Sequence, residues 1–182
     1  PDGEGLDAAE LEVLLYELKA DLNNWMQRLP RDFRVHTLAD VIRFNEQQRH
    51  HEMPFFEQEL FVQAQAKGPL TDTVYRRARE LCLKAARGGI DQTLRQHRLD
   101  AIVALTGGPA WLIDHVNGDS YTGGCSTPAA VAGYPHITVP AVRYAGLPVG
   151  LSFFGAAFSE PTLLRLASGY EHVRGPLPPP PT

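Results

Sequence analysis

The sequence predicts an α/β fold in which helices dominate the first half and a small sheet flanked by helices follows. Apolar residues recur at three- and four-residue spacing through residues 1–98, which is typical of amphipathic helices. Short apolar runs bounded by Gly and Pro follow, which is typical of strands. Only about three such runs occur, too few to close a sheet or to shield its edges. The sequence therefore predicts one lobe of a larger α/β domain.

Helix signals begin close to the start of the chain. Asp7 and Glu10 have capping-box spacing and are expected to open a helix that ends before Pro30. Thr37 is expected to begin a second helix. Pro54 is expected to open a third, because the first turn of a helix tolerates proline.

A long helix is expected from Thr71. Residues 88 and 89 are both glycine, and each destabilises a helix interior by roughly 1 kcal/mol relative to alanine. The helix therefore either bends there or continues to about His97. Residues 101–105 are then continuously apolar, which is typical of a strand covered on both faces. A sheet with helices on both sides is therefore expected.

The last third alternates turns and strands. Thr127 as N-cap and Pro128 at the first helical position are expected to start a short helix that Gly133 ends. Residues 136–140 and 147–154 are expected to pair as an antiparallel hairpin.

Composition changes suggest internal boundaries. Residues 1–98 are mainly helical, residues 99–173 hold the strands, a pocket loop and a closing helix capped by Ser159, and residues 174–182 form a Pro-rich tail expected to be extended or disordered. The chain opens with the loop-like residues 1–5 and lacks an initial Met, so we expect it to be cut from a longer protein.

Charge and cysteine content exclude several function classes. The 17 basic and 21 acidic residues give a net charge of −4 with no basic run, which disfavours nucleic-acid binding. No apolar run reaches the roughly 18 residues of a membrane span, which disfavours a membrane partner. Cys82 and Cys125 have no Cys or His neighbours at metal-ligand spacing, so we expect no metal site, no disulfide framework and a reducing, cytoplasmic location.

Three stretches carry a family resemblance: residues 99–106 (LDAIVALT), 126–140 (STPAAVAGYPHITVP) and 146–155 (GLPVGLSFFG). Together they resemble the C-terminal half of the amidase signature family, and within it the peptide amidase branch. Residues 16–23, 37–45 and 68–70 lie where that family has similar segments. The resemblance covers nearly the whole chain and implies the C-terminal lobe of the family's mixed β-sheet core.

The resemblance implies hydrolysis of a carboxamide by a serine that a lysine activates through a second serine, with backbone N–H groups as oxyanion hole and without metal or cofactor. In the family these groups lie in a Gly-Ser-rich stretch of the N-terminal half, which this sequence lacks. Lys19, Lys67 and Lys84 match none of them. We therefore assign no catalytic residue here, and expect the isolated chain to be inactive and its partner to be the missing N-terminal half.

The resemblance places one segment against the substrate pocket, and we expect it to form the pocket wall: Gly123, Gly124, Cys125, Ser126 and Thr127. Trp111, Asp114 and His115 follow a strand, where open α/β sheets place ligand groups, and are expected at the pocket rim. The alternative for the wall is a structural loop with a helix cap, and for the rim an ordinary surface loop.

The function expected from these points is the C-terminal part of an amidase-signature serine hydrolase that cleaves a peptide amide or small carboxamide. One alternative is a catalytically dead truncated fold or interaction module that binds a partner through its open sheet edge. Another is an independent hydrolase with Cys125 as nucleophile. In either of the first two cases the free chain exposes an apolar face, and we expect it to aggregate, form homo-oligomers or stay bound to its other half.

Overall fold

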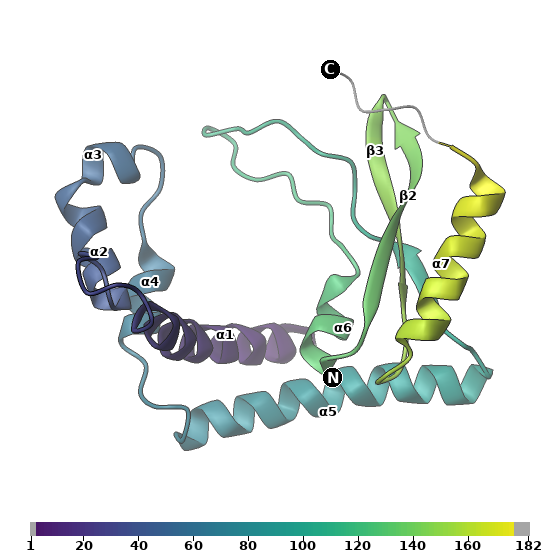
Figure 1. Cartoon of the computed structure of the whole chain (residues 1–182), viewed down its shortest axis with the longest axis horizontal. Coiled ribbons are helices and arrows are strands. Elements are labelled where there is room, and N and C mark those ends of the chain that lie inside the picture. The colour runs from purple at the N-terminus through teal and green to yellow at the C-terminus, as the bar shows by residue number, and fades with distance from the viewer. Residues whose placement is uncertain (1–2, 177–182) are drawn as a thin grey trace. The chain divides into compact units, whose positions relative to one another are not determined.

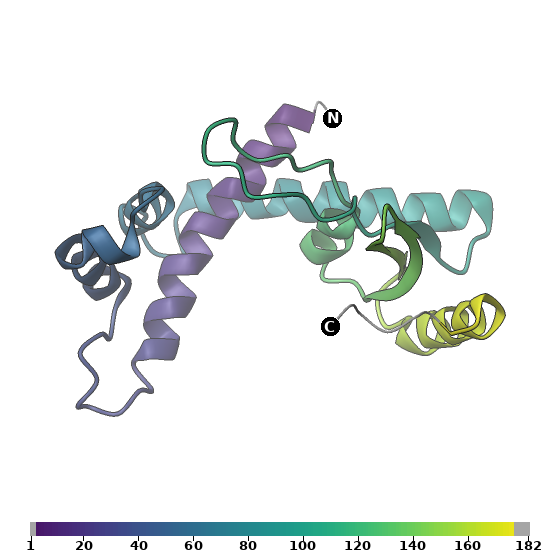
Figure 2. The same cartoon turned by 90° about the horizontal axis from the view of Figure 1, so that it is seen from above.

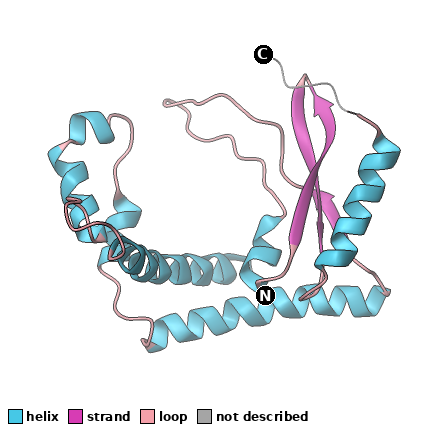
Figure 3. Cartoon of the chain, viewed as in Figure 1, coloured by secondary structure: helices cyan, strands magenta, loops and turns pink. Residues whose placement is uncertain are grey.

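The computed structural model describes residues 3–176. The chain divides into two compact units, residues 1–82 and 83–182. Figure 3 shows that the first unit is helical and that all strands belong to the second. Helix α5 (Thr73–His97) contributes its first part to one unit and the remainder to the other.

The first unit contains α1 (Gly3–Met26), α2 (Leu38–Gln47), α3 (Arg49–Glu52) and α4 (Glu59–Gln65). Its core joins Leu15, Leu38 and Ala64 from three of these helices. Thr37, predicted to begin a helix, is the N-cap of α2, since its Oγ1 accepts the backbone N–H of Asp40 at 3.2 Å.

The second unit places a three-stranded antiparallel sheet between helices (Figures 1 and 2). Its elements are the rest of α5, β1 (Ile102–Leu105), α6 (Ser126–Ala132), β2 (His136–Tyr144), β3 (Leu147–Phe154) and α7 (Glu160–Arg174). The strand order is β1-β3-β2, and β2 and β3 form the predicted hairpin. These elements confirm the predicted fold class.

Two consecutive residues of the central strand divide the core between the two faces of the sheet. Phe154 packs with α5 and α6, in a cluster of Ala86, Ile90, Leu94, Ala129 and Ala132. Phe153 packs with Val139 of β2 and with α7, through Leu163 and Ala167. Because successive strand residues point to opposite faces, β3 anchors helices on both sides.

The structure corrects two helix starts. Asp7 does not cap α1, because the helix already includes Gly3 and Asp7 lies beyond its first turn. Pro54 does not open a helix, because α4 begins only at Glu59. Phe55 and Phe56 are 68% and 75% exposed, so the segment lacks the buried face from which short helices gain their stability.

A third start is shifted in the second unit. Helix α6 begins at Ser126 with Cys125 as N-cap, so Thr127 and Pro128 lie within its first turn. Proline is tolerated there because first-turn N–H groups have no intrahelical acceptor. Gly133 ends the helix in the left-handed conformation, as predicted (φ 68°).

The predicted double coverage of residues 101–105 is wrong. Val103 and Leu105 are 50% and 60% exposed. They point to the face of the sheet on which α7 packs over β2 and β3. The outer edge of β1 pairs with no other strand among residues 3–176.

The remaining expectations concern continuity and boundaries. Helix α5 continues without interruption through residues 88–89 to His97, which settles the alternative left open. Ser159 is the N-cap of α7, although its Oγ donates to the carbonyl of Ala156 at 2.7 Å and makes no capping bond. The division at residues 98 and 173 stays a prediction, and residues 177–182 of the predicted tail lie outside the described residues.

Candidate functional site

A glycine-lined wall forms where the chain leaves β1 and where it enters α6. Gly107 and Gly124 form an antiparallel bridge, and the Cys125 N–H donates to the Thr106 carbonyl at 3.2 Å. The structure thus places residues 106–108 beside residues 123–125. Gly123 and Gly124 are exposed, so this wall presents backbone rather than side chains.

Close packing at two positions and a positive φ at a third explain glycines of the wall. A Cβ at Gly124 would lie 3.0 Å from the Thr106 carbonyl oxygen and 2.9 Å from the Tyr121 hydroxyl. A Cβ at Gly108 would lie 2.1 Å from Thr122 Oγ1. Gly123 has φ +95°, which disfavours other residues. The glycines at 108 and 124 are therefore needed because residues 106, 121 and 122 occupy the space that a side chain would take.

Three hydroxyl groups lie directly behind the wall. Thr106 Oγ1 is 2.8 Å from Ser152 Oγ, and Thr138 Oγ1 is 3.0 Å from the same atom. Ser152 is fully buried at the centre of the sheet. We call these three residues the hydroxyl cluster. It links the end of β1 to both strands of the hairpin.

Cys125 lies close to an imidazole. Its Sγ is 3.9 Å from Nε2 of His136, the first residue of β2. The His136 ring lies 5.9 Å from the ring of Phe154, and Cys125 packs against the same apolar cluster. Both residues are half-buried. The arrangement anchors the entry to α6 and also places a base near a thiol.

The predicted rim residues belong to the loop between β1 and α6. Trp111 donates its indole N–H to Asp119 at 2.7 Å, and its ring lies 6.0 Å from the ring of Tyr121. Tyr121 in turn reaches Gly124, so Trp111 is connected to the wall through it. Leu112, Ile113 and Val116 are more than four-fifths exposed, at 88%, 85% and 91%.

Asp114 holds a turn within this loop. Its Oδ1 accepts the backbone N–H groups of Val116 and Asn117, both at 2.9 Å, and its Oδ2 accepts the Asn117 side chain at 2.7 Å. The hydrogen bond from the Asn117 N–H is the largest cause that lowers the pKa of the Asp114 carboxyl. The carboxylate therefore organises the loop tip.

Residues 123–127, predicted as a wall, lie at the start of α6 with Gly124 beside Gly107, and Tyr121 connects Trp111 to them, whereas Asp114 holds its own turn. Sequence reasoning did not select Thr106, Gly107, Thr138 or Ser152. The available signal was the Thr106-Gly107-Gly108 sequence directly after an apolar strand. It contains a pair of consecutive glycines, as does the Gly123-Gly124 sequence. The contacts of Ser152 come from β2 and from the residue that follows β1, and could not be read from one segment.

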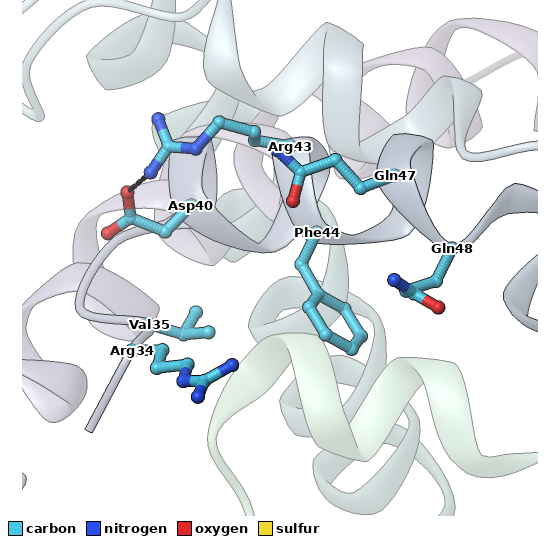
Figure 4. A pocket seen from close by; sticks show the side chains of 7 residues that line it. All are labelled: Arg34, Val35, Asp40, Arg43, Phe44, Gln47 and Gln48. Atoms are coloured by element: carbon cyan, nitrogen blue, oxygen red, sulfur yellow. Dashed lines mark hydrogen bonds and ion pairs between the residues drawn. The ribbon is translucent and has the colours of Figure 1, made fainter.

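A cavity of about 210 Å³ lies in the first unit (Figure 4). It is lined by Arg34, Val35, Asp40, Arg43, Phe44, Gln47 and Gln48. Asp40 and Arg43 are already paired with each other. The lining has no Ser, Cys, His or Lys, and its carboxylate, Asp40, is held by Arg43, so the cavity does not have the lysine and serines of the expected acyl-transfer chemistry.

The lysines of the first unit are engaged in structural contacts. Lys19 Nζ donates to the carbonyls of Gln65 and Lys67, at 2.8 and 2.6 Å. Lys67 pairs with Glu12 at 2.7 Å. Both side chains therefore tie α1 to the end of α4 and the residues after it.

Metal-ligating side chains do not gather in the described part of the chain. Residues 3–176 contain no group of three His, Cys, Asp or Glu side chains that could hold a metal ion. In addition, none of the helices described is both long and apolar enough to cross a bilayer.

Known proteins similar to this chain include amidases. No family model matches it. A probable amidase of Arabidopsis thaliana is 34% identical over 174 residues, which cover 93% of this chain and 30% of that protein. One subunit of the glutamyl-tRNA(Gln) amidotransferase of Rubrobacter xylanophilus is 51% identical over 51 residues, 28% of this chain and 11% of that protein.

Among solved structures, the native peptide amidase of Stenotrophomonas maltophilia is 41% identical, with a TM-score of 0.87, over 100% of this chain and 36% of that one. A peptide amidase in complex with the competitive inhibitor chymostatin gives 42% identity and a TM-score of 0.91 over 100% of this chain and 37% of that one. This chain spans about a third of the length of these peptide amidases. Its homologues and structural neighbours are members of the amidase signature family, and the chain corresponds to the C-terminal part of these enzymes.

Proposed function

We propose that this chain is the C-terminal part of a serine hydrolase that cleaves carboxamide C–N bonds in peptide amides or small amides. The observation that carries the proposal is the similarity to peptide amidases over the full length of this chain, at 41% identity and a TM-score of 0.87. In this proposal the chain supplies the sheet core and one pocket wall. The lysine and the two serines lie in residues outside this sequence.

The proposed substrate-binding residues are those predicted from the sequence: Gly123, Gly124, Cys125, Ser126, Thr127, Trp111 and Asp114. The exposed backbone at Gly123 and Gly124 supports a role as pocket wall, because peptide N–H and C=O groups there can pair with those of an amide substrate. Ser126 and Thr127 are exposed at the start of α6. Trp111 would add an aromatic surface, and Asp114 would shape the loop.

The partner in this proposal is the rest of an amidase polypeptide. Val103 and Leu105 are exposed on β1, and the loop after β1 exposes Leu112, Ile113 and Val116. Burial of such residues is a main source of stability for association. A cytoplasmic location belongs to the same proposal, supported by the free thiols of Cys82 and Cys125.

Ammonia release from a C-terminally amidated peptide tests the proposal. The natural full-length polypeptide that contains this sequence is expected to release ammonia, and residues 1–182 alone are expected to release none. Full-length protein without amide hydrolysis would favour the interaction module. Reading the gene upstream for a lysine followed by a Gly-Ser-rich stretch separates the two in advance.

A second candidate is a thiol-dependent hydrolase, because the Cys125 Sγ lies 3.9 Å from His136 Nε2. A thiol beside an imidazole is the basic arrangement of cysteine nucleophiles. Hydrolysis by residues 1–182 that is lost in Cys125→Ala would establish this candidate and overturn the first proposal. Retention of that activity in Cys125→Ala would exclude the thiol mechanism.

A further inference from the structure

Thr106 connects the sheet to the glycine-lined wall through all of its polar groups. Its N–H donates to the Gly150 carbonyl on β3 at 2.9 Å. Its carbonyl accepts the Cys125 N–H at 3.2 Å. Its Oγ1 lies 2.8 Å from Ser152 Oγ and donates to Thr138 Oγ1 at 3.4 Å. Thr106 is therefore held by β2 and β3 and in turn holds the wall.

The local packing is adapted to this threonine. A Cβ at Gly150 would lie 2.6 Å from Thr106 Oγ1 and 2.8 Å from Thr138 Cγ2. Gly150 thus leaves room for both threonine side chains on the central strand. Ser152 has no access to solvent, so its hydroxyl depends on these threonines for hydrogen bonds.

The position of Thr106 separates this role from support of the sheet alone. The residue lies one position beyond Leu105, the last residue of β1, and directly before Gly107 of the glycine bridge. Loss of its hydroxyl would leave the buried Ser152 with a single threonine partner. A residue with fewer fixed contacts would let the Gly107–Gly124 bridge move relative to the sheet.

We infer that the hydroxyl cluster of Thr106, Thr138 and Ser152 positions the pocket wall, and that Thr106 is the positioning residue that transmits this constraint to Gly124 and Cys125. The inference rests on the proposed function, in which residues 123–127 contact an amide substrate. The hydroxyl cluster then keeps the wall at a constant distance from the sheet.

Hydrogen exchange of the Cys125 amide tests the inference in the natural full-length polypeptide. Thr106→Val removes the hydroxyl with little change of volume and is expected to accelerate this exchange about tenfold, the factor that corresponds to about 1.4 kcal/mol. Thr106→Ser restores the hydroxyl and is expected to return the rate close to that of the unaltered protein. Alkylation of Cys125 by iodoacetamide is expected to follow the same order.

Leu166→Ala is the matched control, because it weakens the packing of α7 on the sheet without touching the hydroxyl cluster. Rates are compared after correction for the global free energy of unfolding of each variant. Equal acceleration in Thr106→Val and Leu166→Ala, or none in Thr106→Val, would overturn the inference. The exchange measurement needs no substrate, so a failure of amide hydrolysis would leave its result for the hydroxyl cluster unaffected.

Discussion

Replacing Gly150 by alanine is expected to destabilise the protein by about 1–3 kcal/mol, the range typical of overpacked cores. The added Cβ would lie 2.6 Å from Thr106 Oγ1, 3.1 Å from Thr106 Cβ and 2.8 Å from Thr138 Cγ2. Relief requires both threonines to move, and they are tied to the buried Ser152. The Thr106 N–H bond to the Gly150 carbonyl would lengthen as well.

Gly88→Ala provides the opposite case with the same chemical change. Gly88 lies inside α5, and a Cβ there meets no atom within 4 Å. Alanine favours a helix interior over glycine by up to about 1 kcal/mol, so this variant is expected to gain stability.

Urea denaturation followed by circular dichroism measures both variants, with the free energy of unfolding extrapolated to water. The expected order of stability is Gly88→Ala, then the unaltered protein, then Gly150→Ala. A Gly150→Ala protein as stable as the unaltered one would refute the packing argument. Faster Cys125 amide exchange in Gly150→Ala than in Gly88→Ala is expected too, because the clash displaces Thr106.

Three further predictions concern other contacts. Ala145 and Gly146 have φ of 50° and 83° in the hairpin turn, as in a type I′ turn. Asparagine tolerates positive φ better than alanine, so Ala145→Asn should raise the free energy of unfolding in urea by about 0.5–1 kcal/mol. No gain would contradict a type I′ turn. The pKa of the Asp40 carboxyl lies below its usual 3.8, and the hydrogen bond from the His36 N–H is the largest cause. The ionised carboxylate therefore stabilises the folded state above pH 3.8, and this stability is lost as the pH falls through the lowered pKa. Asp40→Asn should flatten the acid limb of a pH–stability curve, and an unchanged limb would refute this. Arg87 Nε donates to the Ala132 carbonyl at 2.9 Å at the end of α6, so Arg87→Ala should cost about 1 kcal/mol in thermal or urea unfolding, and a neutral effect would show that the bond adds nothing.

Local signals predicted the elements whose stability depends on nearby residues. The structure contains the helix start at Thr37, the helix end at Gly133 and the hairpin of residues 147–154 with its partner strand. Each depends on backbone geometry within a few residues, which the residue types reveal directly. The start at Pro54 was wrong because a tolerated proline does not supply the packing that a short helix needs.

Coverage of the sheet could not be read from residues 101–105. A continuously apolar strand indicates burial on both faces, but Val103 and Leu105 lie beyond the reach of α7. The apolar pattern shows that both faces of the strand are suited to burial, whereas the structure shows that one face, with Val103 and Leu105, is exposed. This difference is the physical basis for expecting further polypeptide at β1.

The wall of the candidate site was recognisable as a segment, since glycine pairs before a helix allow close backbone approach. The hydroxyl cluster that supports this wall could not be recognised from the sequence. Thr106 directly follows β1, and Thr138 and Ser152 lie in β2 and β3, so their hydroxyl groups meet only when the register of the sheet is set.

Residue order alone was enough for the element types, the hairpin and the family resemblance, because these depend on local backbone preferences and on contiguous motifs. The antiparallel order β1-β3-β2, the bridge between Gly107 and Gly124 and the contact of Cys125 with His136 required the folded chain. They join segments that are distant in sequence, and such contacts follow from how all the apolar faces pack together.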